Sequence, residues 1–217
     1  MKKTLTHAAL IAAAKNFCGL SHAYTELFGV TDGKAIGTFI EHAFQNQLAA
    51  QFDLQIGNSA SGLDLPMIET DIKVTSVRQP QSSSPFRSAR QKVYGLGYNL
   101  LFFVYDKQDN ARTKKAKLDF VSCAFIESSC TGDYRTTRNL LQILANDAMQ
   151  EEIAAYLNDS YLLTDEAERN ALADEIMRTP PTQGYLGTWL KPEWRTWYNR
   201  VIELDEPVAG IVKVVQR

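Results

Sequence analysis

The stretch from 67 to 77 alternates between apolar and polar residues, and this alternation predicts a β-strand with two unlike faces. It is rich in β-branched residues, which favour an extended backbone. The apolar face is formed by Ile68, Ile72 and Val74. The polar face is formed by Glu69, Asp71, Lys73 and Thr75. Because side chains of a strand point alternately to its two sides, one face should pack on a core while the other carries polar chemistry.

A helical repeat of apolar residues lies upstream and predicts a helix over residues 34–52, with Asp32 as its N-cap. The core-facing positions are Ile36, Ile40, Ala43 and Phe44. Glu41 falls at the edge of this apolar face, where a carboxylate is unfavourable unless a charge or a metal accompanies it. Gly33 and Gly37 lie one turn apart and leave room for another backbone or a ligand.

The rest of the pattern predicts further strands and helices, with polar segments between them. The expected strands are 99–105, 117–126 and 208–215. The expected helices are two short ones within 6–30, one from Ser84 to Gly95, and two longer ones at 134–158 and 164–178. Residues 79–85 should form a polar loop, and core packing is expected of the tryptophans Trp189, Trp194 and Trp197.

This series of elements predicts an α/β fold with a mixed central β-sheet flanked by helices. A length of 217 residues suits one domain with a sizeable core. We therefore expect a single domain over residues 1–217, with a core at about 32–127 and with helical and C-terminal elements at about 134–217.

Charge is distributed unevenly along the chain. The net charge is -2, which argues against unselective adhesion to nucleic acid. Residues 73–117 nevertheless contain ten lysines and arginines and two acids, whereas residues 147–217 contain seven basic and thirteen acidic residues. A phosphate backbone could lie along the basic segment, although a solvated surface would look the same in the sequence.

Three cysteines and three histidines show no zinc-ligand spacing, and this composition fits a reduced, cytoplasmic setting. The apolar run near the N-terminus is only seven residues long and predicts a helix rather than a signal peptide. No stretch approaches the roughly 20 apolar residues of a membrane span, so no membrane association is expected.

Candidate chemistry lies in the pattern D-x6-D-x-K formed by Asp64, Asp71 and Lys73. Asp71 and Lys73 share a strand face, and Asp64 can join them if the chain turns or a neighbouring strand begins between 64 and 67. Carboxylate oxygens are the ligands that Mg²⁺ prefers, and such a site can assist phosphodiester cleavage. The alternative is a surface hairpin whose charges are merely solvated.

The spacing of these three residues resembles the PD-(D/E)xK nuclease superfamily, which includes type II restriction endonucleases. The departure is Leu63 where that pattern has proline, with Pro66 following the first acid instead. The resemblance implies a single nuclease domain with a restriction-endonuclease-like core. It also implies that Asp64, Asp71 and the carbonyl of Ile72 hold Mg²⁺, while Lys73 orients the attacking water or stabilises transition-state charge.

The arrangement G-x3-G-x3-E, formed by Gly33, Gly37 and Glu41, resembles the MutH mismatch-repair nicking enzyme and related restriction enzymes. In that family the helix glutamate joins the metal site, which implies a catalytic role for Glu41. The separation between Glu41 and Asp64 is longer than that family's usual one. The alternative is a partly exposed glutamate on a core helix.

The order of catalytic strand, basic helix and buried strand also resembles the common core of the superfamily, in which the helix often faces DNA. Glutamine and serine in the preceding loop can read base edges, and arginine and lysine can contact phosphates. The DNA-binding candidates are Arg78, Gln79, Gln81, Ser83, Arg87, Arg90 and Lys92.

The sequence therefore predicts a type II restriction endonuclease that makes sequence-specific double-strand cuts in DNA with Mg²⁺. Enzymes that cut palindromes are usually homodimers, and a cognate DNA methyltransferase encoded nearby would protect the host. Three alternatives stay open: a MutH-like or other repair enzyme that nicks DNA, a non-catalytic DNA-binding protein, and an unrelated α/β protein with a chance motif.

Overall fold

The computed structural model describes residues 2–54, 62–147, 149–160, 162–163, 165–188 and 195–216. Contacts group the chain into two compact units. Unit 1 comprises residues 1–82, 98–126 and 201–217, and unit 2 comprises residues 83–97 and 127–200. The expectation of a single nuclease domain stays a prediction.

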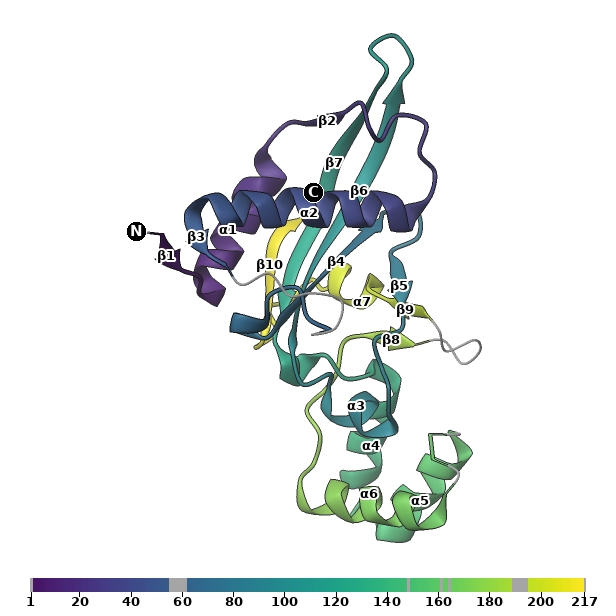
Figure 1. The fold of residues 1–217 in the computed structure, drawn as a ribbon. Helices are drawn as coiled ribbons and strands as arrows, with labels where there is room; N and C mark the ends of the chain where they lie inside the picture. Colours follow the sequence, from purple (N-terminus) through teal and green to yellow (C-terminus); the bar gives the residue numbers. More distant parts are fainter. Residues whose placement is uncertain are drawn as a thin grey trace. The chain divides into compact units, whose positions relative to one another are not determined.

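Unit 1 contains most of the strands and two long helices (Figure 1). Its elements are β1 (Lys3–Thr4), α1 (His7–Gly19), β2 (His22–Tyr24), α2 (Gly33–Gln51), β3 (Phe52–Asp53), a 3-10 turn (Pro66–Ile68), β4 (Thr70–Ser76), β6 (Asn99–Asn110), β7 (Lys115–Ile126) and β10 (Ile211–Gln216). Two short elements span the boundaries between the units: β5 (Gln81–Ser83) and α7 (Asn199–Ile202).

The central sheet of unit 1 has the strand order β10-β7-β6-β4, with β2 also paired to β7. β4 runs parallel to β6, whereas β7 is antiparallel to β6, β10 and β2. Apolar residues of α1 and α2 pack with Ile72 of β4 and with Leu101 and Phe103 of β6 in one buried core. The predicted mixed α/β fold with a central sheet flanked by helices is therefore confirmed.

The helix expected at 34–52 is confirmed within one residue at each end. The Asp32 side chain caps it by accepting a hydrogen bond from the Lys34 N–H at 3.0 Å. The predicted core stripe is buried at Ile36, Ile40 and Phe44. Amphipathic periodicity and a capping side chain are local signals, so the sequence located this element well.

The strand expected to start at residue 67 starts at Thr70 instead. Pro66–Ile68 form a 3-10 turn, and Glu69 adopts a left-handed backbone with φ of 46°. The predicted division of faces holds, because Ile72 and Val74 pack in the core. The correction follows from the proline and the turn, which no alternation pattern encodes.

Several other boundaries are corrected by long-range pairing. The second short helix expected before residue 30 is wrong, since β2 pairs there with β7. β5 lies within the expected loop, and Ser88 rather than Ser84 caps the helix that follows. β6 and β7 are longer than the apolar runs that predicted them, because polar residues of the two arms pair with one another. The last strand begins at Ile211 rather than at residue 208.

Unit 2 is built mainly from helices. Its elements are α3 (Ala89–Tyr94), a 3-10 turn (Ser128–Cys130), α4 (Tyr134–Leu144), α5 (Gln150–Asp159), α6 (Glu166–Arg178), β8 (Gly187–Thr188) and β9 (Arg195–Trp197). The helix expected at 134–158 is thus two helices. Leucine, isoleucine and alanine side chains of α4, α5 and α6 form the unit's own apolar core around Val93 of α3. Two of the expected tryptophan positions, Trp189 and Trp194, lie outside the described residues.

The three cysteines, Cys18, Cys123 and Cys130, are buried free thiols. Burial raises the pKa of the Cys123 thiol well above its ordinary value, and the neighbouring Cys18 thiol raises it further. Cys18 and Cys123 therefore act as apolar core residues in unit 1. Within the described ranges, no helix is both long and apolar enough to cross a membrane.

Candidate active site

The open edge of β4 brings Asp64 to the sequence motif. β4 ends the main strand order, so the side of this strand away from β6 has no strand partner on that path. Leu65 and Thr70 exchange backbone hydrogen bonds of 3.0 and 3.2 Å across the 3-10 turn. This turn reverses the chain, and Asp64 Oδ2 accepts a hydrogen bond from the Ile72 N–H at 2.7 Å. The chain therefore turns directly after Asp64, over residues 65–70, and the expected approach of Asp64 to the motif strand is present.

Asp71 and Lys73 lie on one face of β4, as their spacing predicted. Lys73 Nζ is 2.5 Å from Asp71 Oδ2. The Asp71 side chain is 8% exposed and that of Lys73 is 29% exposed, so the pair is largely shielded from water. A shielded ion pair is screened weakly, and each charge strongly affects the protonation of its partner.

α2 brings Glu41 to the same place. A Cβ atom added to Gly37 would lie 3.4 Å from the Val74 carbonyl oxygen, so the absence of a side chain lets the helix approach the β4 backbone. Glu41 lies one turn further along α2. Its carboxyl group shares a hydrogen bond with that of Asp64, and the charges of Lys73 and Asp71 also act on it. The structure thus brings together all four catalytic candidates from the sequence.

Burial is the largest influence on all three carboxyl groups and raises their pKa values. The effect is largest for Asp71, whose pKa rises from 3.8 to about 6 even though Lys73 opposes the change. The hydrogen bond between Asp71 and Asp64 raises the pKa of Asp71 and lowers that of Asp64. It therefore favours a protonated Asp71 that donates to the Asp64 carboxylate. The buried Asp71 and the half-buried Glu41 and Asp64 accompany a single lysine, and this excess of negative charge favours a bound cation.

The available donor atoms suit a hard divalent cation. In a strand, the N–H and C=O of one residue point to the same edge. Because the Ile72 N–H donates to Asp64 at the open edge of β4, the Ile72 carbonyl also faces that edge. Mg²⁺ binds through one or two carboxylates and keeps several waters, and Asp64, Asp71 and the Ile72 carbonyl provide that set. Among the described residues, no group of three or more acidic, histidine or cysteine side chains is placed so that it could hold one metal ion, so the set relies on two carboxylates and a backbone carbonyl. The ammonium group of Lys73 lies against Asp71 instead.

The raised pKa of Asp71 predicts a change in stability with pH. Between pH 3.8 and about 6 the folded chain binds more protons at Asp71 than the unfolded chain, so the free energy of unfolding falls as pH rises through this window. Asp71→Asn removes the titration. We expect the metal-free variant to be more stable than the wild type at pH 8, by about 1–2 kcal/mol, and to lose this advantage at pH 4.

Thermal unfolding in EDTA at the two pH values measures this difference. Asp119→Asn is the matched control, because Asp119 also pairs with a lysine in unit 1 but its side chain is 37% exposed. Equal unfolding temperatures of the wild type and Asp71→Asn at pH 8 would show that burial does not disfavour the ionised form of Asp71.

Of the DNA-binding candidates, Arg78 and Gln79 lie exposed in the turn that follows β4. Gln81 is half-buried, and its N–H donates to Thr75 Oγ1 at 3.1 Å, which anchors the segment after the turn to β4. Ser83 is exposed at the end of β5. The side chains of Arg78 and Gln79 are therefore accessible to a ligand beside the motif strand.

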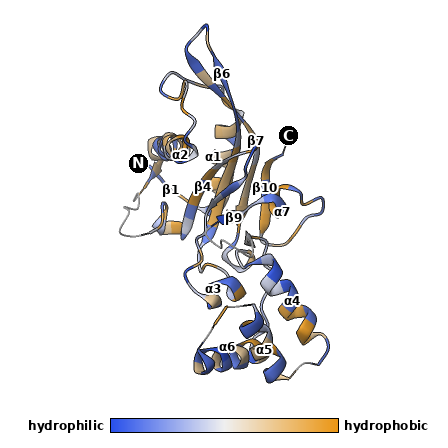
Figure 2. Cartoon of the chain, turned by 90° about the vertical axis from the view of Figure 1, so that its right-hand side faces the viewer, coloured by the Kyte–Doolittle hydropathy of each residue, from blue (hydrophilic) through white to orange (hydrophobic). Residues whose placement is uncertain are grey.

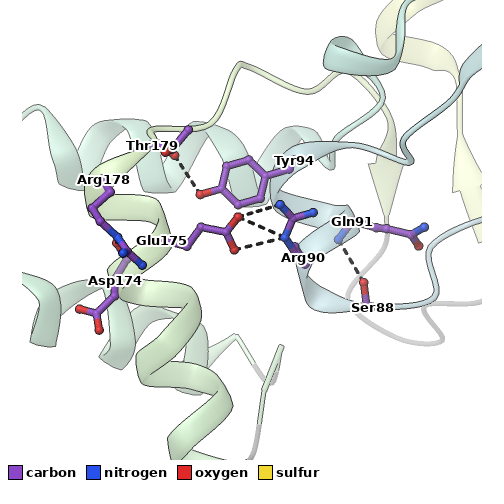
Figure 3. A network of polar contacts seen from close by, with 8 residues as sticks. All are labelled: Ser88, Arg90, Gln91, Tyr94, Asp174, Glu175, Arg178 and Thr179. Carbon is purple, nitrogen blue, oxygen red and sulfur yellow. Dashed lines mark hydrogen bonds and ion pairs between the residues drawn. The ribbon is translucent and has the colours of Figure 1, made fainter.

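The remaining candidates lie in unit 2, on α3 or just before it. Arg87 is exposed and Lys92 is buried. Arg90 binds Glu175 of α6 through both carboxylate oxygens at 2.7–3.2 Å, and its guanidinium lies 5.1 Å from the Tyr94 ring centroid (Figure 3). The Tyr94 hydroxyl in turn donates to the Thr179 carbonyl at 2.8 Å. A phosphate contact from Arg90 would compete with Glu175, and the burial of Lys92 makes it the least accessible candidate.

Sequence reasoning did not single out Glu175 as a partner of Arg90. The two residues are separated by 85 positions, and Glu175 lies on a helix that carries many acids. Only the packing of α6 in the core shared with α3 brings this particular glutamate to the arginine. No spacing rule within one element contains that information.

Comparison with known proteins adds two findings to this geometry. A sequence model of the family described as "Type II restriction enzyme NspV" matches residues 4–213. A curated protein of Nostoc sp. (strain ATCC 29411 / PCC 7524), named Type II restriction enzyme NspV, is 46% identical over 209 residues, which cover 96% of this chain and 93% of that protein. No solved structure matches the chain.

Proposed function

This chain belongs to the type II restriction enzyme NspV family and is a site-specific deoxyribonuclease, and we propose that Glu41, Asp64, Asp71 and Lys73 form its cleavage centre. The observation that carries this assignment is the cluster at the open edge of β4, where the buried Asp71 and the half-buried Glu41 and Asp64 converge with Lys73. A solvated surface hairpin, the competing interpretation of the motif, would leave these side chains exposed. The cluster also supports membership of the PD-(D/E)xK superfamily.

Each side chain has a distinct part in the proposed hydrolysis. Asp64 and Asp71, with the Ile72 carbonyl, would hold the divalent cation that type II restriction enzymes generally need, and we propose Mg²⁺. The bound cation would neutralise phosphate charge and lower the pKa of a coordinated water. The hydrogen bond from the Ile72 N–H fixes one oxygen of Asp64. Glu41 lies beside Asp64, and its interaction with the charge of Lys73 helps to position the ammonium group.

Lys73 is proposed to stabilise negative charge as it develops on the phosphate in the transition state. The Asp71 carboxylate, 2.5 Å from Lys73 Nζ, favours the charged form of the lysine. Direct deprotonation of water by Lys73 is therefore disfavoured. Attack of water on phosphorus breaks the bond to the 3′ oxygen and leaves a 5′-phosphate and a 3′-hydroxyl.

Two partners beyond the DNA substrate follow from the proposed reaction. Two cleavage centres related by a two-fold axis would match the symmetry of a palindrome and cut both of its strands, so we propose a homodimer. A restriction activity also requires protection of the host's own sites, so we propose a cognate DNA methyltransferase.

The test is digestion of unmethylated phage DNA by the purified protein with Mg²⁺ or with EDTA. Discrete double-strand fragments with 5′-phosphate ends that form only with Mg²⁺ would support the proposal. Nicked circles would favour the MutH-like alternative. Intact DNA with Mg²⁺, together with salt-dependent binding, would favour a non-catalytic DNA-binding protein.

A further inference from the structure

The hairpin of β6 and β7 carries exposed cations at its far end that the proposed cleavage centre does not use. β4 pairs with β6 only as far as Tyr105, whereas β6 and β7 pair with each other out to Asn110 and Lys115. The far end of the hairpin is coloured hydrophilic in Figure 2. We define the tip cluster as Arg112, Lys114 and Lys115, all of which are exposed.

The tip cluster differs from the other lysines of this hairpin. Lys107 binds Asp109 at 2.6 Å and Lys117 binds Asp119 at 2.8 Å, so these two charges are neutralised locally. No member of the tip cluster forms an ion pair with a residue that the structure describes. Lys114 Nζ instead lies 5.1 Å from the Phe28 ring centroid, a contact that holds the ammonium while leaving its charge uncompensated.

Hydrogen bonds support the turn at the tip. Asn110 Oδ1 accepts hydrogen bonds of 3.0 Å from the N–H groups of both Arg112 and Thr113, and Lys114 adopts a left-handed backbone. β2 pairs with residues 116–118 of β7, next to the tip, and the Gly29 N–H donates to Asp109 Oδ2 at 3.2 Å. A supported turn presents its cations with less conformational entropy to lose on binding than a flexible loop.

The hairpin extends from the cleavage centre in a defined direction. Lys73 is in register with Phe102, and the Val77 N–H bonds to the Tyr105 carbonyl just before the turn that carries Arg78. β6 then continues to Asn110. At about 3.3 Å per strand residue, the path from Phe102 to Asn110 is roughly 26 Å. A duplex that lies along the hairpin would span this path with about eight base-pair steps.

We propose that the tip cluster binds the phosphate backbone of double-stranded DNA outside the recognition sequence, about eight base pairs from the cleaved bond. This inference rests on the proposed function for the position of that bond. Phosphate contacts need positive charge rather than detailed shape complementarity, and uncompensated exposed cations provide it. An acidic surface of a second protein copy is the competing occupant.

The test compares Arg112→Gln/Lys115→Gln with Lys3→Gln/Lys15→Gln. The control pair removes the same charge from exposed lysines on β1 and α1, and β1 pairs with β3 at the C-terminal end of α2, away from the hairpin. Both pairs are placed in an Asp71→Ala background so that DNA stays intact. Binding is measured by fluorescence anisotropy from 50 to 200 mM salt, on duplexes with about 5 or about 20 base pairs on each side of the cleavage site.

We expect the control protein to bind the longer duplex more tightly and the tip variant to lose that advantage. Each lost contact should reduce the salt slope by about 0.9, so the tip variant's deficit should be about tenfold larger at 50 mM than at 200 mM salt. An unchanged slope and length advantage would overturn the proposal. The proposal would also be overturned if the tip variant's salt slope were unchanged while its sedimentation depended on protein concentration differently from that of the control. That result would favour a contact with a second protein copy.

Failure of the proposed function would look different. With Asp71 intact, the tip variant should cleave the short duplex at the wild-type rate, because the tip does not reach that DNA. Absence of cleavage by the wild-type protein would reject the cleavage centre and the distance counted from it, whereas the salt slope of the tip variant on a long duplex would still test the phosphate contact. The two hypotheses therefore fail in separate measurements.

Discussion

Asp71→Ala is expected to lower the single-turnover rate of DNA cleavage by about a thousandfold or more, while the affinity for DNA changes little. Removal of one preorganised electrostatic group at an active centre costs roughly 10²–10³ in rate, and Asp71 is proposed both to hold the cation and to pair with Lys73. Its side chain is 8% exposed, so water has little access to replace the lost carboxylate.

Asp119→Ala is the matched control for this prediction. Asp119 is also an aspartate of the unit 1 sheet paired to a lysine two residues away, at 2.8 Å, but it lies on β7. Quenched-flow cleavage of a labelled duplex gives the rates, and a gel shift in EDTA gives the affinities. Cleavage by Asp71→Ala at the wild-type rate would remove Asp71 from the mechanism.

Lys73→Met has the second largest expected effect, a loss of about 10²–10³ in cleavage rate. The substitution removes the charge proposed to stabilise the transition state but keeps an unbranched side chain. It also removes the charge that lowers the pKa of Asp71, so this pKa should rise further above about 6. Because the ionised carboxylate is the form that binds a cation, the residual activity should require a higher pH than the wild-type activity.

The pH profile separates an electrostatic role of Lys73 from a merely structural one. Lys73→Arg keeps the charge and should hold the acid limb of the profile near its wild-type position, whereas Lys73→Met should shift it upward. Lys117→Met removes a lysine from an exposed ion pair and should leave the profile unchanged. An unshifted acid limb in an active Lys73→Met protein would contradict the coupling between Lys73 and Asp71.

The parts of the site that lie within one element could be predicted from the sequence. Asp71 and Lys73 follow from the two-residue period of a strand, and Gly37 and Glu41 from the four-residue stripe of a helix. These spacings survive folding because the backbone of each element fixes them. The face of β4 that packs on the core was predictable for the same reason, since Ile72 and Val74 alternate with polar residues.

The parts that depend on tertiary packing could not be predicted in the same way. Asp64 reaches Ile72 only through the left-handed Glu69 and the 3-10 turn before it. The approach of α2 to Val74 is a contact between elements distant in sequence. The length of the β6–β7 hairpin was underestimated because its outer residues are polar, and their pairing rather than burial extends the strands.

Divalent-cation binding tests most directly whether this cluster is the metal centre of the enzyme. Mn²⁺ binding can be followed by electron paramagnetic resonance for the wild type, for Asp64→Asn/Asp71→Asn and for the control Asp119→Asn, with and without DNA. Loss of groups that merely support metal ligands already costs about 10–100-fold in affinity. We therefore expect the double variant to bind Mn²⁺ at least that much more weakly, and the control to bind it normally. Equal Mn²⁺ affinity in the double variant and the wild type would place the cation elsewhere and contradict the proposed cleavage centre.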